Sequence, residues 1–305
     1  MKKILLTGAT GFIGRHCLST LSARGYEVHA TSTKESIDDQ LNSDVYWHKV
    51  DLLDSDSLWN LMAKVKPSHL LHFAWYAVPG KYWTSLENLR WVQASLDLLQ
   101  AFIRHGGERA VMAGTCAEYD WRYGYCSEGA TPRVPSTLYG TCKHSLQIML
   151  DSAAKQAELS TAWGHIFYLY GPHENPNRLV ASVIRSLLFG EPALCSHGNL
   201  IRDFLYVQDV ADAFVALLES DVEGTVNIAS GRPIALKDII LKLACKLDRQ
   251  NLVRFGAIQP PENDPPFLIA DVRRLANEVG WVPKYDLDSG LNQTINWWRS
   301  NLGIK

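Results

Sequence analysis

The sequence predicts an α/β protein built on a doubly wound parallel sheet, with a second, smaller mixed α/β lobe. Three observations support this fold class. Short apolar runs alternate with amphipathic stretches over the first 171 residues, as they do when parallel strands are joined by right-handed helical crossovers. The first apolar run breaks directly into a cluster of glycines. The alternation becomes irregular after Pro172, where a separate lobe is expected to begin.

The elements of the first part follow from the spacing of apolar residues and from the residues that interrupt it. Helical spacing ends at Gly25 and again at Gly106, and Pro67 precedes a strand. The expected strands are residues 4–6, 26–31, 45–50, 68–74, 109–113 and 160–170. The expected helices are residues 12–24, 55–65, 86–105 and 139–155. This order is typical of a Rossmann-type fold.

The rest of the chain is assigned to the smaller lobe, apart from one return to the large sheet. The expected helices are residues 179–189, 210–219, 271–279 and 287–302, and the expected strands are 203–207 and 226–230. The large domain is predicted to span residues 1–171, with the chain returning at 208–230. Residues 172–207 and 231–305 then form the smaller lobe. The cleft between two lobes is the default place for a ligand.

Composition excludes several classes of function. With 30 basic and 32 acidic residues the net charge is −2, which gives no electrostatic footprint for nucleic acid or a membrane surface. The six cysteines are scattered without a Cys-x-x-Cys pair, so neither a disulfide frame nor a metal site is expected. Lys2 and Lys3 precede an apolar run that breaks at Gly8, which argues against a signal peptide. A cytoplasmic protein is expected.

The glycine cluster is the most informative stretch of the chain. Gly8, Gly11 and Gly14 lie between the first strand and the first helix. Such a turn needs positive φ angles, and a backbone without Cβ lets a diphosphate come close to the unpaired N–H groups of the helix. The alternative is an ordinary glycine-rich turn. The candidate cofactor-binding residues of this turn are Gly8, Thr10, Gly11, Phe12, Ile13 and Gly14.

A Tyr-x-x-x-Lys pair opens the helix predicted at 139–155. Tyr139 and Lys143 are four residues apart and therefore share one helix face. A nearby ammonium group favours phenolate, so Lys143 is expected to lower the pKa of Tyr139 toward the range of a working acid or base. Thr115 places a hydroxyl just past the fifth strand, at the edge where ligands of such sheets bind. The alternative for the pair is a solvated helix face.

Six motifs in the same order make the chain resemble the extended short-chain dehydrogenase/reductases that act on nucleotide-linked sugars. The motifs occupy residues 7–14, 51–52, 114–119, 139–143, 169–172 and 202–207. The resemblance implies that Thr115, Tyr139 and Lys143 form a catalytic triad. It places the cofactor against further residues, namely Asp51, Leu52, Phe73 and Ala74. It also implies that Arg202 binds the substrate diphosphate, the alternative being a structural salt bridge to Asp203 or Asp209.

Departures from the family narrow the expected chemistry. Sugar-nucleotide 4,6-dehydratases carry Asp-Glu where this chain has Cys116-Ala117, so dehydration is not expected. The base of the 3,5-epimerising reductases is a cysteine at the position of Ala117, and Cys116 should point to the opposite face of an extended segment. His173 matches the partner acid of those enzymes. It is expected either to contact substrate or to be an ordinary loop histidine.

Three other residues are candidates for the sugar-nucleotide site. Trp75 and Tyr168 replace smaller or amide side chains that are common in the family. They indicate either a reshaped sugar pocket or an altered core. Arg178 follows the sixth strand and is a further candidate substrate-binding residue.

Cofactor choice depends on the end of the second strand. NAD enzymes place Asp or Glu there to accept hydrogen bonds from the ribose 2′-hydroxyl. This chain has Ser32, Thr33 and Lys34 there, with Arg15 just beyond the last glycine. NADP(H) is therefore preferred, because two cations could pair with a 2′-phosphate. NAD(H) is the alternative, with Lys34 as a solvated loop residue.

The expected activity is reduction of a nucleotide-linked 4-keto-6-deoxy sugar at C4, with Tyr139 as proton donor. One alternative is a C4 epimerase that retains NAD, and another is a non-catalytic dinucleotide-binding regulatory protein. A homodimer is expected through the helices at 86–105 and 139–155, because their apolar residues cover more than one face. The expected partner molecule is a nucleotide-diphosphate sugar.

Overall fold

A parallel sheet forms the centre of the computed structural model, which describes residues 2–35, 44–259 and 264–304. The strand order is β11-β7-β5-β4-β1-β2-β3, and every pairing in this sheet is parallel. The strands are β1 (Lys3–Thr7), β2 (Glu27–Ser32), β3 (Val45–Lys49), β4 (His69–His72), β5 (Arg109–Thr115), β7 (Ser160–Ile166) and β11 (Gly224–Ile228). The strand order reverses between β1 and β4, which is where such sheets bind ligands. This confirms the predicted Rossmann-type fold.

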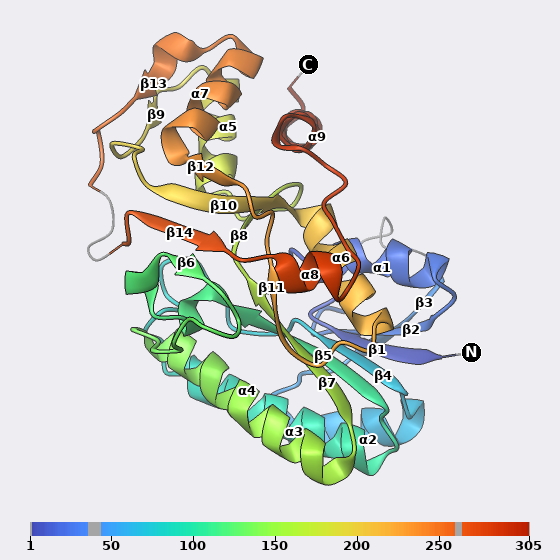
Figure 1. The fold of residues 1–305 in the computed structure, drawn as a ribbon. Coiled ribbons are helices and arrows are strands. Elements are labelled where there is room, and N and C mark those ends of the chain that lie inside the picture. The colour runs from blue at the N-terminus through green and yellow to red at the C-terminus, as the bar shows by residue number, and fades with distance from the viewer. Residues whose placement is uncertain (1, 36–43, 260–263, 305) are drawn as a thin grey trace.

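Helices cover both faces of this sheet (Figure 1). On one face lie α1 (Gly14–Ala23) and α6 (Val207–Glu219), and on the other lie α2 (Ser55–Val65), α3 (Glu87–Arg104) and α4 (Leu138–Ala157). Successive residues of a strand point to opposite faces. Accordingly Leu6 packs in the core that contains α1 and α6, and Leu5 in the core that contains α2 and α3.

A second, mixed sheet lies beside the first. Its order is β12-β10-β14-β6, with β8 also paired to β10, and only the β10–β12 pairing is antiparallel. The strands are β6 (Tyr125–Cys126), β8 (Tyr168–Tyr170), β10 (Ile201–Tyr206), β12 (Pro233–Ala235) and β14 (Phe267–Ala270). A third core is formed with α5 (Leu179–Leu188), α7 (Leu236–Leu247), α9 (Leu287–Leu302), β9 (Ala193–Leu194) and β13 (Val253–Arg254). The predicted smaller lobe with mixed structure is therefore present.

The remaining short elements lie in connections. They are the 3₁₀ turns η1 (Cys116–Glu118), η2 (Trp121–Tyr123) and η3 (Gln250–Leu252), and the helix α8 (Arg273–Asn277). No helix among the described residues is both long and apolar enough to cross a bilayer. All six cysteines are free.

The strand predicted at 160–170 is two strands in different sheets. β7 ends at Ile166, the N–H of Phe167 makes one more bond to Ile228, and β8 then pairs with β10. The prediction is wrong there because every residue from 166 to 170 favours a strand, so no local signal marks the change of sheet. Two helix limits also differ, since α6 begins at Val207 and α8 covers only Arg273–Asn277. β6 and β8 belong to the smaller sheet although they precede residue 171. The predicted boundaries between the two lobes therefore remain a prediction.

Candidate functional site

The glycine turn has the shape that a diphosphate site requires. Gly8 has φ +68°, and a Cβ there would lie 2.8 Å from the backbone nitrogen of Ala74. A Cβ on Gly14 would collide with the carbonyl oxygen of Gly8. The N-cap of α1 is Ile13, which caps no N–H with its side chain. The first amides of α1 can therefore face an anion that approaches this turn.

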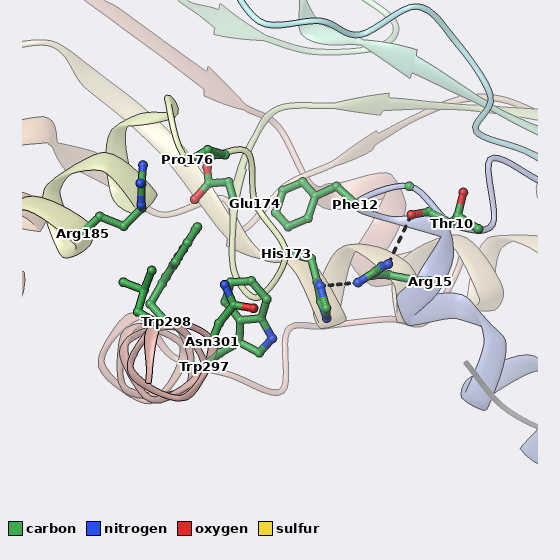
Figure 2. Close-up of a pocket in the computed structure, with 12 residues that line it drawn as sticks. Thr10, Phe12, Arg15, His173, Glu174, Pro176, Arg185, Trp297, Trp298 and Asn301 are labelled. Atoms are coloured by element: carbon green, nitrogen blue, oxygen red, sulfur yellow. Dashed lines mark hydrogen bonds between the residues drawn. The ribbon is translucent and has the colours of Figure 1, made fainter. Parts of the chain in front are cut away.

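A cavity of about 460 Å³ lies between the glycine turn and α9. Figure 2 shows Thr10, Phe12 and Arg15 on one side of it and the α9 tryptophans on the other. Arg15 contacts the ring of His173, and its Nη2 lies 3.5 Å from the carbonyl oxygen of Thr10. The centre of the His173 ring lies 4.5 Å from that of the Trp297 ring. The backbone of His173 has a φ angle of +67°. The structure thus brings Arg15 together with His173, two residues that the sequence assigned to different ligands.

Glu174 also lines this cavity and was not predicted from the sequence. It is 6% exposed, and burial raises the pKa of its carboxyl to about 8, against the opposing influence of Arg178. No periodic pattern surrounds it, so only the fold reveals that the side chain points inward.

The further residues expected to bind the cofactor follow strands of the same sheet. Asp51 follows β3 and accepts a hydrogen bond from the N–H of Leu53 at 3.0 Å, and Leu52 is buried. Phe73 and Ala74 follow β4, next to the glycine turn. The ring of Phe73 packs 4.8 Å from that of Phe214.

The last residue of β2 is not acidic. Ser32 is buried, and its hydroxyl accepts the N–H of Lys34 at 3.1 Å. Thr33 and Lys34 are exposed. The first acidic residue beyond them, Glu35, pairs with Lys49 at 2.6 Å. The β2 end therefore presents a hydroxyl and a cation.

Thr115 and Tyr139 meet at the carboxyl end of β5. Thr115 is the last residue of β5, and its side chain lies near enough to the phenol of Tyr139 to favour the ionised form of that phenol. Tyr139 lies in the first turn of α4, where the Thr137 side chain accepts the N–H of Gly140 at 3.1 Å. The capped turn holds the phenol beside the Thr115 hydroxyl, so the two groups can act on one ligand oxygen.

Lys143 does not lower the pKa of Tyr139. Burial, followed by the neighbouring Tyr82, raises the pKa of the Tyr139 phenol above its usual value, and the Thr115 side chain only opposes this. The ammonium of Lys143 instead donates to the carbonyl oxygen of Ala113 at 2.8 Å and lies 3.8 Å from the centre of the Trp75 ring. The predicted effect is wrong because burial and Tyr82 determine the direction of the shift, and Lys143 is not among the groups that act on the Tyr139 phenol. Burial also lowers the pKa of Lys143 itself to about 7, with Glu118 opposing.

Aromatic rings enclose Tyr139. The centres of the Trp75, Tyr82 and Trp83 rings lie 6.5, 4.9 and 5.8 Å from that of Tyr139. The indole of Trp75 is fixed by a 2.8 Å hydrogen bond to Asn88. Trp75 was expected in the sugar pocket or the core, whereas Tyr82 and Trp83 were missed because their segment has no periodic pattern. These rings form an apolar wall at the site, which we call the aromatic wall.

The residues after Thr115 form a tight turn. Cys116 and Ala117 belong to η1, so the prediction that Cys116 lies in an extended segment is wrong. The signal was present as a capping box, in which Thr115 and Glu118 bond reciprocally to each other's backbone. Burial raises the pKa of the Cys116 thiol far above its usual value. Neither Cys116 nor Ala117 supplies an acid or a base here.

Arg202 is buried and stacked on Tyr168. Its side chain is 1% exposed, its Nη2 lies 2.6 Å from Asp264, and its guanidinium lies 5.4 Å from the Tyr168 ring centre. The alternative partners named from the sequence are wrong. Asp203 accepts N–H groups of Ser230 and Gly231, and Asp209 accepts those of Lys284 and Tyr285.

Arg178 is exposed at the start of α5. Its guanidinium lies 5.5 Å from the centre of the Tyr82 ring, so it borders the aromatic wall.

Comparison with known proteins identifies the family to which this chain belongs. Residues 4–229 match the model of the NAD dependent epimerase/dehydratase family. The UDP-glucose 4-epimerase of Azospirillum brasilense is 28% identical over 323 residues, covering 98% of this chain and 92% of that protein. UDP-glucuronic acid decarboxylase 1 of Xenopus tropicalis is 26% identical over 315 residues, covering 99% and 73%.

Solved structures agree in fold. The UDP-glucose 4-epimerase of Thermus thermophilus, solved in complex with NAD, matches with a TM-score of 0.85 and 25% identity. The match covers 97% of this chain and 99% of that one. These likenesses confirm the resemblance inferred from the six motifs.

Proposed function

Because the chain belongs to the NAD dependent epimerase/dehydratase family, we propose that it is an NADP(H)-dependent reductase of a nucleotide-linked 4-keto-6-deoxy sugar. The placement of Tyr139 near Thr115, next to a turn that lacks an acid–base pair, carries this proposal. Dehydration and 3,5-epimerisation both need a base at that turn, whereas reduction of a ketone needs only a hydride and a proton.

Tyr139 gives its phenolic proton to the C4 oxygen of the keto sugar, and the carbonyl becomes an alcohol. Thr115 donates a hydrogen bond to the same oxygen and orients it. The glycine turn would hold the diphosphate of a nicotinamide cofactor, which would supply the hydride for C4. Lys143 binds the nicotinamide ribose through its ammonium, and the buried Arg202 beside Tyr168 binds the substrate diphosphate.

The aromatic wall favours reduction over epimerisation. A C4 epimerase must return the hydride to the opposite face of the sugar, which requires the sugar to turn over inside the site. Trp75, Tyr82 and Trp83 pack around Tyr139 and favour a single orientation. The apolar rings also suit a substrate with a methyl group at C5.

The second candidate is a C4 epimerase that retains NAD. The specific support is the likeness to the Azospirillum brasilense epimerase, and the same three residues serve this reaction. A non-catalytic dinucleotide-binding regulator is disfavoured, because such a protein has no use for a phenol placed beside the Thr115 hydroxyl.

The preference for NADP(H) rests on the end of β2. Ser32 offers no negative charge to repel a 2′-phosphate, and Lys34 is exposed beside it. Glu35 is directed to Lys49 instead. The six free cysteines fit a cytoplasmic enzyme.

Two measurements test the proposal. The purified protein is analysed for bound cofactor, and NAD held after purification supports the epimerase, whereas uptake of added NADPH by a cofactor-free protein supports the reductase. Nucleotide sugars are then incubated with NADPH and followed by mass spectrometry. A gain of two mass units in a 4-keto-6-deoxy sugar supports the reductase. A 4-keto-6-deoxy sugar whose mass stays unchanged in the presence of NADPH contradicts it.

A further inference from the structure

A buried polar network lies directly behind Thr115. Glu118 is fully buried, and its Oε1 accepts the backbone N–H of Thr115 at 2.9 Å and the indole N–H of Trp163 at 3.0 Å. Its Oε2 lies 3.2 Å from Nε2 of His165, which is also fully buried. The other ring nitrogen of His165, Nδ1, lies 3.0 Å from the hydroxyl of Tyr119.

The far end of the network fixes where the Tyr119 proton goes. The side-chain nitrogen of Asn227 donates to the carbonyl oxygens of Cys126 and Asp271, both at 3.0 Å. Because carbonyl oxygens only accept, these two bonds set the orientation of the amide. The Asn227 oxygen therefore faces Tyr119 at 2.8 Å and accepts its single hydroxyl proton.

Each of the two hydrogen bonds of His165 then requires a proton on the ring nitrogen that makes it. The Tyr119 oxygen has no proton left, so the 3.0 Å contact needs a proton on Nδ1. On the other side, an ionised Glu118 can only accept, so the 3.2 Å contact needs a proton on Nε2. The third proton of this network belongs to the imidazole rather than to Glu118, because the carboxylate already accepts the N–H groups of Thr115 and Trp163, which favour its ionised form.

We propose that His165 is a doubly protonated positioning residue that pairs with Glu118 and so fixes Thr115 at the end of β5. The catalytic part of this statement rests on the proposed function, while the protonation state does not. The pair would hold the hydroxyl-bearing residue from behind, without touching substrate or cofactor.

The groups around the pair agree with this assignment. Burial opposes ionisation of Glu118, yet His165 and the donors from Thr115 and Trp163 hold the pKa of that carboxyl below its usual range. On α4, His144 lies 4.0 Å from Glu118, but burial lowers the pKa of His144.

Lys143, Glu128 and Arg133 are further charged groups near the network. Lys143 is near enough for Glu118 to raise its pKa, and its ammonium is bonded to Ala113. Glu128 lies beyond Asn227, whose N–H it accepts at 2.8 Å. His165 is the group in direct contact with Oε2 of Glu118.

The first experiment reads the protonation state and needs no substrate. The protein is labelled with ¹⁵N-histidine, and the ring nitrogens are observed by NMR at neutral pH. The His165 signals are assigned by their loss in His165→Gln. If that variant does not fold, they are assigned by contact with the Tyr119 ring, whose centre is 4.7 Å away. Two protonated ring nitrogens are expected, and one unprotonated nitrogen overturns the proposal.

The second experiment is a double-mutant cycle. Glu118→Gln and His165→Gln each leave one buried charge without its partner, so each should lower the melting temperature by roughly 5–10 °C. The double variant replaces both charges with amides that can bond to each other. Its loss should be clearly smaller than the sum of the two. Additive losses would contradict an ion pair.

A turnover measurement then tests the positioning role. His165→Gln should lower kcat roughly tenfold with little change in the KM for cofactor, because Thr115 loses its support. The matched control is His144→Gln, which alters the more distant histidine and should keep kcat. Equal kcat values in the two variants would overturn the role in positioning. A protein without reductase activity would leave the NMR and melting results intact.

Discussion

The backbone N–H of Tyr139 donates a hydrogen bond to the carbonyl oxygen of Trp83 at 3.1 Å. The first N–H groups of a helix lack partners within the helix, so this bond and the Thr137 cap satisfy two of them. It also ties the segment that carries Tyr82 and Trp83 to the first turn of α4. The acid and the aromatic wall around it are therefore positioned together.

Replacing Tyr139 with phenylalanine tests the acid. The fold and cofactor binding should persist, because the ring still packs against Tyr82 and Trp83. Turnover should fall by ~10²–10⁴, the usual share of general acid catalysis. Steady-state kinetics and a cofactor titration measure the two effects. Tyr123→Phe is the control, since that side chain is 56% exposed. A Tyr139→Phe enzyme with wild-type turnover would show that another group donates the proton.

Ser32→Asp tests the choice of cofactor. A carboxylate at the end of β2 repels a 2′-phosphate and accepts from a 2′-hydroxyl, so the ratio of NADPH to NADH affinity should fall. Fluorescence titration with both cofactors gives this ratio. Thr33→Asp places the same charge on an exposed neighbour and serves as the comparison. Unchanged NADPH affinity in Ser32→Asp would mean that the 2′-phosphate does not lie there.

Lys143 should make stability depend on pH. Its pKa is about 7 in the fold and 10.5 in the reference state, so between these values the unfolded chain binds more protons. Stability should therefore rise with pH across this window, by at most about 1.4 kcal/mol per pH unit. The variant Lys143→Met should be more stable than wild type at low pH, and this difference in the free energy of unfolding should shrink from about pH 7 upward. Melting curves at several pH values measure it.

The matched control for this measurement is Lys155→Met. Lys155 lies on the same helix but is exposed, so its replacement should not change the slope of stability with pH. A constant difference between Lys143→Met and wild type at all pH values would show that Lys143 keeps its normal protonation in the fold.

A homodimer through α3 and α4 remains a prediction. The two helices lie side by side on one face of the sheet (Figure 1), and Leu89 and Ile148 on them are each 53% exposed. Sedimentation equilibrium should show twice the chain mass of 34.2 kDa. Leu89→Glu or Ile148→Glu should dissociate the dimer and keep cofactor binding.

The control for the dimer surface lies on the other lobe. Leu241 on α7 is 45% exposed, and Leu241→Glu should not change the mass. A wild-type protein that sediments as a single chain would rule out the dimer. Leu96 and Met149 are less suitable for this test because both are half-buried, and Leu96 packs against the core.

The sequence predicts those features that local patterns encode. The glycine turn needs three glycines at fixed spacing, and Thr115 and Tyr139 follow directly from strand and helix limits, so all were placed correctly. The enclosure by Tyr82 and Trp83 depends on how a non-periodic segment folds over α4. No local pattern carries that information. The same holds for Arg15, whose neighbour His173 lies in the connection between β8 and α5.

The degree of burial of the site residues could not be predicted from the sequence either. The spacing of Tyr139 and Lys143 correctly indicated a shared helix, but the sign of the pKa effect on Tyr139 depends on the rings packed around it. Arg202 gives a similar lesson, because its partner Asp264 lies distant in sequence on the approach to β14.

The cavity of Figure 2 joins residues from opposite ends of the sequence, since Thr10, Phe12 and Arg15 face Trp297, Trp298 and Asn301 across it. During translation the glycine turn leaves the ribosome early, whereas the opposite wall of the cavity waits for α9 to emerge. A nascent chain can therefore offer a ligand only one half of this cavity. A molecule that touches both walls can therefore be held tightly only after α9 has been synthesised.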